Sequence, residues 1–282
     1  MTTGTDQMRG ARWGRWRVTV IQDDQVIEHR DLPHRLDRGI AERAAIGLVV
    51  LATDQTIEHE WRLLLDLPGV ALYQSRILND AAITPATLQA MEARLAEAAG
   101  LILPGLPLDV VGFGCTSASM VIGEERVFEL IREVRPGIAC TTPITAAFAA
   151  FRALGVRRVA LLTPYRDDIN RFMRGYIEAR GFEVPVMGSF NEEDDRRAAR
   201  IDPASIRDAA LRLGRSAPVE AVFVSCTSLR LVEAVAGIEA ELDKPVTSSN
   251  HALAWHCLRL AGIAEPMPQW GRLFERDLTP LP

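Results

Sequence analysis

Lysine is almost absent from this sequence of 282 residues: of its 32 basic residues, Lys244 alone is a lysine and all others are arginines. A pyridoxal phosphate enzyme needs a lysine to hold its cofactor as a Schiff base. Lys244 directly precedes Pro245 at the start of an expected strand, which is a poor position for that role. Any amino-acid chemistry is therefore expected to proceed without pyridoxal phosphate, and we expect no cofactor.

Patterns typical of metal sites and of disulfide frameworks are also missing. The five histidines include no pair four residues apart, and no Cys-x-x-Cys occurs, so the sequence predicts no metal site. The cysteines are few for the length of the chain, which favours reduced thiols over a disulfide framework. They are Cys115, Cys140, Cys226 and Cys257.

Long apolar runs and an excess of basic charge are absent as well. The longest apolar stretch, Ile46 to Ala52, is far shorter than the roughly 20 residues that a membrane helix needs, and the N-terminus has no hydrophobic signal core. The formal net charge is -5 and the basic residues are spread along the chain, so no basic stripe is present to neutralise phosphates. We therefore expect a cytoplasmic protein with neither a membrane nor a nucleic acid as partner.

Apolar runs typical of strands alternate with helix-like runs over most of the chain, which is long enough for two lobes. This alternation predicts an α/β fold with parallel sheets and crossover helices. In the arginine-rich first 40 residues, Trp16 to Ile21 and Val26 to Arg30 are expected to form a hairpin. The expected strands are Ile46 to Ala52, Val70 to Gln74, Val110 to Phe113, Val159 to Leu162, Glu183 to Met187, Ala221 to Val224 and Val246 to Ser248. Expected helices include Thr56 to Leu65, Pro85 to Ala99, Thr145 to Leu154, Arg166 to Arg180, Pro203 to Leu213, Leu229 to Ala236 and Ala252 to Leu260.

A tetrapeptide is nearly repeated along the chain, as Gly114-Cys115-Thr116-Ser117 and Ser225-Cys226-Thr227-Ser228. Each copy follows an apolar run and precedes a helix-like segment, so both cysteines are expected at strand-to-helix junctions. Free backbone N–H groups and the positive end of a helix dipole stabilise a thiolate or a carboxylate there. A single cysteine after an apolar run is ordinarily a buried core residue, and Cys140 and Cys257 are interpreted in that way. The matched pair instead predicts two facing thiols around an anionic substrate.

These motifs resemble those of the aspartate/glutamate racemase superfamily, in the branch that contains maleate cis-trans isomerase and arylmalonate decarboxylase. The resemblance covers most of residues 44 to 262. Besides the two Cys-Thr-Ser motifs, it rests on Leu161-Leu162-Thr163-Pro164-Tyr165 with Asn170, on Asn191, and on Ser248-Ser249-Asn250 before a helix with Trp255. Residues 51 to 58 further resemble the members encoded with ectoine-utilisation genes.

The resemblance implies two flavodoxin-like lobes with parallel sheets, related by a pseudo-twofold axis, and an active site in the cleft between the lobes. We expect residues 1–40 to be an N-terminal extension. Residues 41–142 with 245–282 are expected to form the first α/β lobe, and residues 143–244 the second.

Two opposed cysteines imply a racemase or isomerase that needs no cofactor. One sulfur removes a proton from a carbon beside a carboxylate and the other returns a proton to the opposite face. In the maleate isomerase variation, the resemblance implies that the cysteine matching Cys115 attacks the alkene and the one matching Cys226 handles a proton. Decarboxylase members carry glycine in place of Cys115, so the presence of both thiols favours isomerisation. The developing charge needs donors, for which the motif residues Thr116, Ser117, Thr227 and Ser228 are suited.

Further substrate contacts follow from the resemblance at Tyr165, Asn191 and Asn250. Maleate isomerase-like members have asparagine in place of Asp54, and an ionised aspartate there would repel a carboxylate. We therefore interpret Asp54 as facing an ammonium or an amide, which points to an amino-acid derivative. Each of these residues has a structural alternative: Tyr165 as a strand-end aromatic, the asparagines in turns or caps, and Asp54 as a helix cap. The run from Glu192 to Arg197 is interpreted most simply as a solvated loop, although in two-lobed enzymes such a loop can close over the cleft.

We thus expect a homo-oligomeric isomerase or racemase of a small carboxylate, with an amino-acid derivative of ectoine catabolism as its substrate. Three alternatives remain open at this point. They are a maleate cis-trans isomerase, an arylmalonate-type decarboxylase and a non-catalytic small-molecule binding protein with unreactive thiols.

Overall fold

The computed structural model of the chain describes residues 29, 31–216 and 218–279. The chain divides into one unit of residues 1–37 and another of residues 38–282. The hairpin expected between Trp16 and Arg30 lies, except for His29, outside the described residues. All helices and strands described below belong to the second unit.

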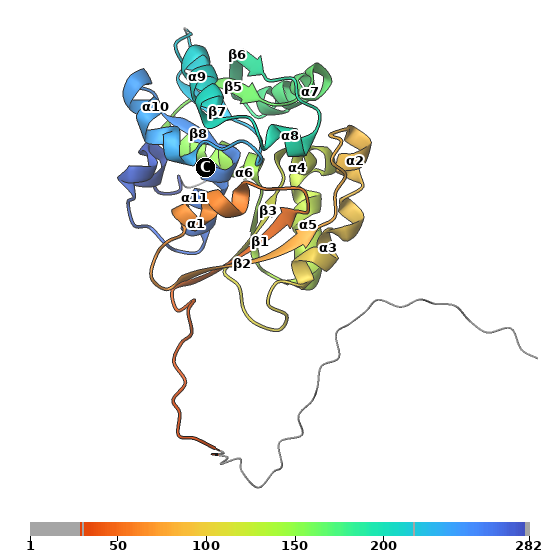
Figure 1. Cartoon of the computed structure of the whole chain (residues 1–282), viewed down its shortest axis with the longest axis vertical. Coiled ribbons are helices and arrows are strands. Elements are labelled where there is room, and N and C mark those ends of the chain that lie inside the picture. Colours follow the sequence, from red (N-terminus) through yellow and green to blue (C-terminus); the bar gives the residue numbers. More distant parts are fainter. Residues whose placement is uncertain (1–28, 30, 217, 280–282) are drawn as a thin grey trace, which may run out of the picture. The chain divides into compact units, whose positions relative to one another are not determined.

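The first sheet contains four parallel strands in the order β2-β1-β3-β4 (Figure 1). Its strands are β1 (Ala44–Leu51), β2 (Val70–Ile77), β3 (Val110–Gly114) and β4 (Ala139–Thr141). Every residue of β1 and β3 is buried, as expected for central parallel strands with helices on both faces. β4 was not among the expected strands, because its three residues, Ala-Cys-Thr, include no valine, isoleucine or aromatic residue to mark a strand.

The second sheet repeats this arrangement with the order β6-β5-β7-β8, again all parallel. Its strands are β5 (Arg158–Thr163), β6 (Glu183–Ser189), β7 (Ala221–Val224) and β8 (Val246–Ser248). The two sheets together confirm the predicted α/β fold. β8 is hydrogen bonded within the second sheet although it follows residue 244, where the second lobe was expected to end. The exact limits of the two lobes stay a prediction.

Helices connect the strands and cover both sheets. They are α1 (Ile57–Leu64), α2 (Pro85–Gln89), α3 (Glu92–Gly100), α4 (Thr116–Ile122), α5 (Glu124–Val134), α6 (Pro143–Leu154), α7 (Asp167–Glu178), α8 (Asp195–Ala198), α9 (Pro203–Gly214), α10 (Val235–Leu242) and α11 (Ser249–Leu260), with short 3₁₀ segments at Val232–Ala234, Pro268–Trp270 and Arg272–Glu275. Within the described range, no helix is both long enough and apolar enough to cross a membrane.

Two expected helices differ from the structure. The single helix expected over Pro85 to Ala99 is two helices, because the backbone N–H of Met91 bonds to Leu88 and that of Arg94 to Met91, three residues back instead of four. The helix expected over Leu229 to Ala236 begins later: residues 229–231 are irregular, and α10 follows the 3₁₀ turn Val232–Ala234.

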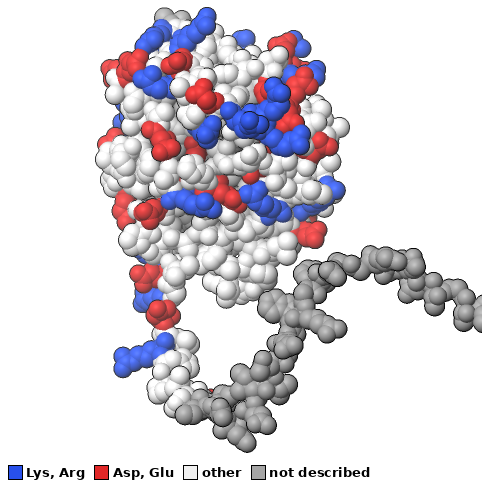
Figure 2. All heavy atoms as spheres, viewed as in Figure 1, with Lys and Arg blue, Asp and Glu red and all other residues white. Residues whose placement is uncertain are grey.

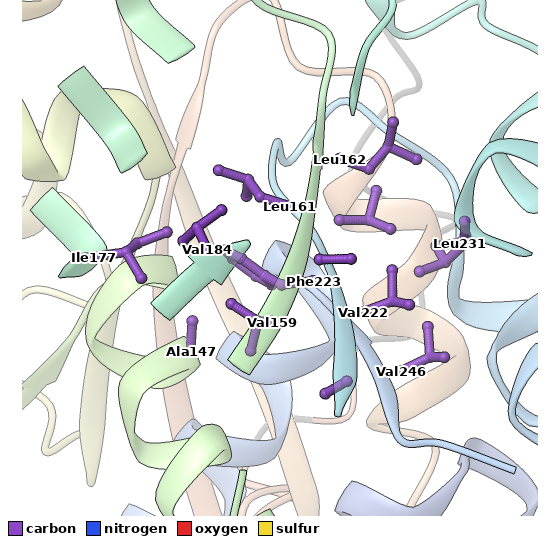
Figure 3. Packing of buried hydrophobic residues seen from close by; sticks show 14 of the residues in the cluster. Ala147, Val159, Leu161, Leu162, Ile177, Val184, Val222, Phe223, Leu231 and Val246 are labelled. Carbon is purple, nitrogen blue, oxygen red and sulfur yellow. The ribbon is translucent and has the colours of Figure 1, made fainter. Parts of the chain in front are cut away.

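The hydrophobic core of the second sheet lies between β5, β7 and their covering helices (Figure 3). Phe223 of β7 is fully buried and its ring meets that of Phe151 on α6 edge to face, with 5.5 Å between centroids. α6 and α11 pack against each other, and α11 also contacts β3 of the first sheet and β8 of the second. This close packing of buried side chains holds the ends of the strands in fixed positions.

Candidate active site

Each motif cysteine lies within two residues of the carboxyl end of a central strand. Cys115 follows β3 with an extended backbone (φ -146°, ψ 114°), and α4 begins at the next residue, as predicted. Cys226 lies two residues after the end of β7, but no helix begins there. The chain instead forms a turn in which the Leu229 N–H donates to the Cys226 carbonyl oxygen, at 3.3 Å. The expectation of a second strand-to-helix junction is therefore wrong.

One small cavity brings most of the predicted site residues together. Its volume is about 20 Å³, room for about one water molecule, so the site is narrow in this conformation. Asp195 and parts of residues 79–91 complete its wall. The predicted residues on the wall are Cys115, Thr116, Ser117, Tyr165, Cys226 and Thr227.

Both motif thiols are held in the protonated form by their surroundings. Burial, with a smaller contribution from the carboxylates of Asp195 and Asp54, raises the pKa of Cys115 and of Cys226 to about 12. Hydrogen bonds to the sulfurs lower the two pKa values, but by less than burial raises them. Cys115 Sγ lies 3.8 Å from Ser117 Oγ. The Ser228 N–H donates to Cys226 Sγ over 3.4 Å.

Tyr165 is buried between the two thiols. Burial raises the pKa of its hydroxyl well above the usual value, and the neighbouring Cys226 and Cys115 add to the rise. The hydroxyl is therefore a neutral hydrogen-bond donor beside both sulfurs. Its position on the cavity wall is that of a residue able to contact a small substrate.

Asp54 is buried at the start of α1 and is not part of the cavity wall, and the structure confirms its alternative role as a helix cap. Its contact with a substrate nitrogen stays a prediction. Its Oδ1 accepts hydrogen bonds from the backbone N–H groups of Thr56 and Ile57, at 2.7 and 2.8 Å, and so caps the start of α1. Its Oδ2 is buried without a hydrogen-bond partner among the described residues. Burial raises its pKa to about 6, and the carboxylate of Asp195 adds to the rise.

Besides Asp54, three predicted residues do not lie on the cavity wall. Asn191 is exposed in a turn after β6 with a left-handed backbone (φ 52°), which favours asparagine, and its N–H donates to Ser189 Oγ. Asn250 is fully buried in the first turn of α11. Ser228 lies just behind the wall and donates to Asp195. Substrate binding by these three residues stays a prediction.

Asp195 is a site residue that was not predicted from the sequence. The run from Glu192 to Arg197 was expected to be a solvated loop, but it contains the short helix α8, and Asp195 is only 5% exposed and lies on the cavity wall. Asp194 caps this helix by accepting hydrogen bonds from two backbone N–H groups. An aspartate is a preferred helix cap, and this was the signal in the sequence that a helix begins here. The burial of Asp195 results from contacts with residues distant in sequence, so local pattern did not reveal it.

A backbone bridge joins the two segments that cover the cavity. Residues 81–83, which follow β2, pair antiparallel with residues 193–195, which follow β6. The Ile83 N–H donates to the Glu193 carbonyl oxygen at 3.3 Å, and the Asp195 N–H donates to that of Ala81 at 3.2 Å. The bridge contains only these two backbone hydrogen bonds.

Glu60 supports the Cys226 turn from behind and was also not predicted. It is 2% exposed, and its Oε1 accepts from the backbone N–H groups of Leu231 and Val232, at 2.6 and 2.8 Å. Burial raises its pKa to about 7. Glu60 belongs to an amphipathic helix, and its position in the sequence gives no sign that it is buried.

Groups suited to metal binding do not occur in the described part of the chain: no three His, Cys, Asp or Glu side chains are arranged to hold an ion there. His251 and His256 are buried in α11 and form hydrogen bonds with the hydroxyls of Thr247 and Thr141.

Figure 2 shows acidic and basic side chains interspersed on the face in view.

Comparison with known proteins finds relatives across most of the chain. The family described as Arylmalonate decarboxylase matches residues 47–274, a range that includes both cysteine motifs. The chain is 36% identical over 143 residues to arylmalonate decarboxylase of Bordetella bronchiseptica, a match that spans 50% of this chain and only 60% of that protein. It is 30% identical over 245 residues to maleate isomerase of Nocardia farcinica, spanning 82% of this chain and 96% of that protein. Among solved structures, it is similar to a mutant of Nocardia farcinica maleate cis-trans isomerase with a covalently bound succinylcysteine intermediate, with a TM-score of 0.74, 27% identity and coverage of 82% of this chain and 98% of that one.

Proposed function

Since the chain belongs to the arylmalonate decarboxylase family, we propose that it is an isomerase or racemase of a small carboxylate that works through Cys115 and Cys226 without a cofactor. The observation that carries this proposal is the presence of both thiols on the wall of one cavity. Membership of the branch confirms the predicted resemblance. A closer relation to the ectoine-utilisation members stays a prediction.

Two-base racemisation fits the composition of the cavity. A thiolate at one cysteine takes the proton from the carbon beside the substrate carboxylate, and the electron pair of that C–H bond is delocalised into the carboxylate. The thiol of the other cysteine then gives its proton to the opposite face of the carbon. The hydroxyl groups of Thr116, Ser117 and Thr227, together with that of Tyr165, are placed on the wall to stabilise the developing charge.

Cis-trans isomerisation of an alkene dicarboxylate uses the same two groups differently. The Cys115 thiolate adds to one alkene carbon while the Cys226 thiol protonates the other, the new single bond rotates, and elimination restores both sulfurs. The succinylcysteine in the solved maleate isomerase supports this route for that relative. We keep it as the second form of the proposed activity.

Decarboxylation is the second candidate, and the 36% identity to an arylmalonate decarboxylase favours it. Cys226 alone would then protonate the carbanion left by loss of carbon dioxide. The second thiol at Cys115 has no part in that reaction, which is why we rank isomerisation first.

The substrate is proposed to be an amino-acid derivative, in a reaction of ectoine catabolism. The support for an amino group is Asp54, whose buried carboxylate would repel a second carboxylate of the substrate. The support for ectoine catabolism is the resemblance of residues 51–58 alone.

The experiment that tests the proposal is proton NMR in deuterium oxide with maleate, aspartate, glutamate and diaminobutyrate derivatives, and with an arylmalonate. We expect deuterium to enter at the carbon beside the carboxylate of an amino compound, and the exchange to be lost in Cys115→Ser and in Cys226→Ser. Cys140→Ser, a thiol away from the cavity, is the control and should retain the exchange. Fumarate from maleate would indicate the alkene route, and carbon dioxide from an arylmalonate would indicate the decarboxylase. No reaction on any compound would favour a binding protein.

A further inference from the structure

The charged side chains on the cavity wall are all acidic. Asp195 and Asp80 lie on its wall and Asp54 lies beside it, whereas no described residue of the wall is an arginine, lysine or histidine. The guanidinium of Arg76 comes near Asp54 but binds its backbone carbonyl oxygen, at 3.1 Å, and forms its ion pair with Glu58, at 2.6 Å. The carboxylates that face the thiols are therefore not neutralised by a protein cation on the wall.

Asp195 is held in one orientation by two hydroxyl groups. Its Oδ1 accepts from Ser228 Oγ at 2.6 Å, and its Oδ2 accepts from Thr53 Oγ1 at 2.5 Å. Both donors are neutral, and each carboxylate oxygen can accept a second hydrogen bond. A fixed carboxylate with unused acceptor capacity in a narrow cavity is a site for a cationic donor.

Asp54 supplies a second acceptor of the same kind. Asp54 is 2% exposed and no hydrogen bond reaches its Oδ2 atom among the described residues, but the nearby Thr227 side chain lowers the pKa of this carboxyl. Leaving a buried carboxylate oxygen unpaired costs free energy unless a ligand satisfies it. Cys115, Cys226 and Asp195 lie on the wall of one cavity, and Asp54 is near enough to Asp195 and to both thiols to raise the pKa of each thiol.

We propose that Asp195, together with Asp54, is the specificity-determining element of this site, and that the pair selects a small carboxylate that also carries a cationic nitrogen. This proposal rests on the proposed function and names its substrate class. The nitrogen binds between the two carboxylates and supplies the positive charge that the wall lacks.

The same charge acts on the thiols. In the free protein, burial and the two carboxylates keep the pKa of Cys115 and Cys226 near 12, so a thiolate is scarce at neutral pH. A cation bound to the carboxylates removes part of that repulsion and favours the thiolate. The thiol proton is released to water as the substrate binds. The nitrogen of the substrate would thus activate the thiol that reacts with the substrate. A neutral or purely anionic compound would not activate the thiol.

Binding of two matched probes to the full chain tests the proposal. We would measure calorimetrically the affinity for 2,4-diaminobutyrate and for succinate, a four-carbon dicarboxylate without nitrogen, with wild type, Asp195→Asn and the control Glu193→Gln. Glu193 is a neighbouring acid whose side chain is 62% exposed. We expect Asp195→Asn to weaken diaminobutyrate binding by about tenfold or more, since one partner of a buried charge pair is lost, and to leave succinate binding equal or tighter. Glu193→Gln should change neither affinity.

A spectroscopic measurement tests the effect on the thiols. Thiolate absorbance near 240 nm should rise when diaminobutyrate binds to wild type at pH 8, and the rise should be absent with succinate and much smaller in Asp195→Asn. The same measurement in Cys115→Ser and Cys226→Ser assigns the thiolate to one cysteine. Asparagine can keep hydrogen bonds to both hydroxyls, so we expect Asp195→Asn to fold, and Asp54→Asn is a second variant that makes the same prediction.

Several results would overturn the proposal. They are equal weakening of both probes in Asp195→Asn, succinate binding to wild type more tightly than diaminobutyrate, and no binding of diaminobutyrate to wild type. Failure of the proposed function is a separate result: selective binding that depends on Asp195, without any exchange at the carbon, would uphold the selectivity and remove the isomerase activity.

Discussion

The side-chain amide of Asn250 links Glu60 to the turn that carries Cys226. Its Nδ2 donates to Glu60 Oε2 at 2.7 Å and to the carbonyl oxygen of Thr227 at 2.8 Å. All three groups are buried. The position of the second thiol is thus fixed by a hydrogen-bond network between α1, α11 and the turn after β7.

The first prediction follows from this link. Asn250→Ala leaves a carboxylate oxygen and a carbonyl oxygen buried without donors, so we expect the free energy of unfolding to fall by about 2–4 kcal/mol. Urea unfolding monitored by circular dichroism measures the change. Asn191→Gly is the matched control, because Asn191 is exposed and glycine accepts its φ of 52° without strain. Equal stability of Asn250→Ala and wild type would show that the network does not support the fold.

The second prediction concerns pH. The pKa of Glu60 is about 7 in the folded protein against its usual 4.5, so the folded state retains a proton that the unfolded state loses between these values. The contribution of Glu60 to stability is therefore full below about pH 4.5 and falls toward pH 7, by at most about 1.4 kcal/mol per pH unit. Above pH 7 it changes no further.

Glu60→Gln isolates this effect. His251 and His256, whose pKa values burial lowers to about 4, make stability rise with pH over the same range, so the wild-type profile alone is a sum of opposed terms. The difference between wild type and Glu60→Gln, from urea unfolding at pH 5, 6, 7 and 8, should change steadily up to about pH 7 and then level off. A difference that is constant with pH would contradict the prediction.

The third prediction uses two glycines of β3. A Cβ at Gly114 would lie 3.1 Å from Ile57 Cδ1 and 3.2 Å from the Val49 carbonyl oxygen, whereas a Cβ at Gly112 would have no neighbour closer than 3.4 Å. Gly114→Ala must therefore displace the strand end that carries Cys115. We expect it to lower the turnover number by about tenfold to a hundredfold, because catalysis is sensitive to such shifts.

Gly112→Ala, two residues earlier on the same strand, is its control and should stay within about twofold of wild type, since its contacts are ordinary. The exchange rate in the NMR assay measures both. Equal rates for the two variants would show that the close approach at Gly114 is not needed to place the thiol.

The fourth prediction concerns access to the cavity. A space of about 20 Å³ is too small for a carboxylate substrate, so the bridge between residues 81–83 and 193–195 must open for entry. We expect the amide hydrogens of Ile83 and Asp195 to exchange faster than those of central β1 in the free protein, and to become protected when a substrate binds. Hydrogen exchange measured by NMR checks this. Protection as strong as in β1 without ligand would indicate another entry route.

Much of the fold was predictable from local pattern. Continuous apolar runs such as Ile46 to Ala52 indicate buried parallel strands, because a strand covered on both faces leaves no polar position. The short strand β4 was missed because it contains no residue typical of strands except Thr141. The break between α2 and α3 and the turn after Cys226 were missed because they depend on a few backbone hydrogen bonds that the sequence pattern does not reveal.

By itself, the sequence determined the two strand ends and the residue types placed there, Cys115-Thr116-Ser117 and Cys226-Thr227-Ser228, because apolar runs and the repeat are local properties of the chain. Only the tertiary structure decided which acids face them. Asp195 lies in a run of charged residues that looks solvated, and it becomes part of the cavity because Thr53 and Ser228, more than 30 residues away, meet its carboxylate. Burial and the loss of solvent screening are properties of that packed assembly, and they give the site its negative charge.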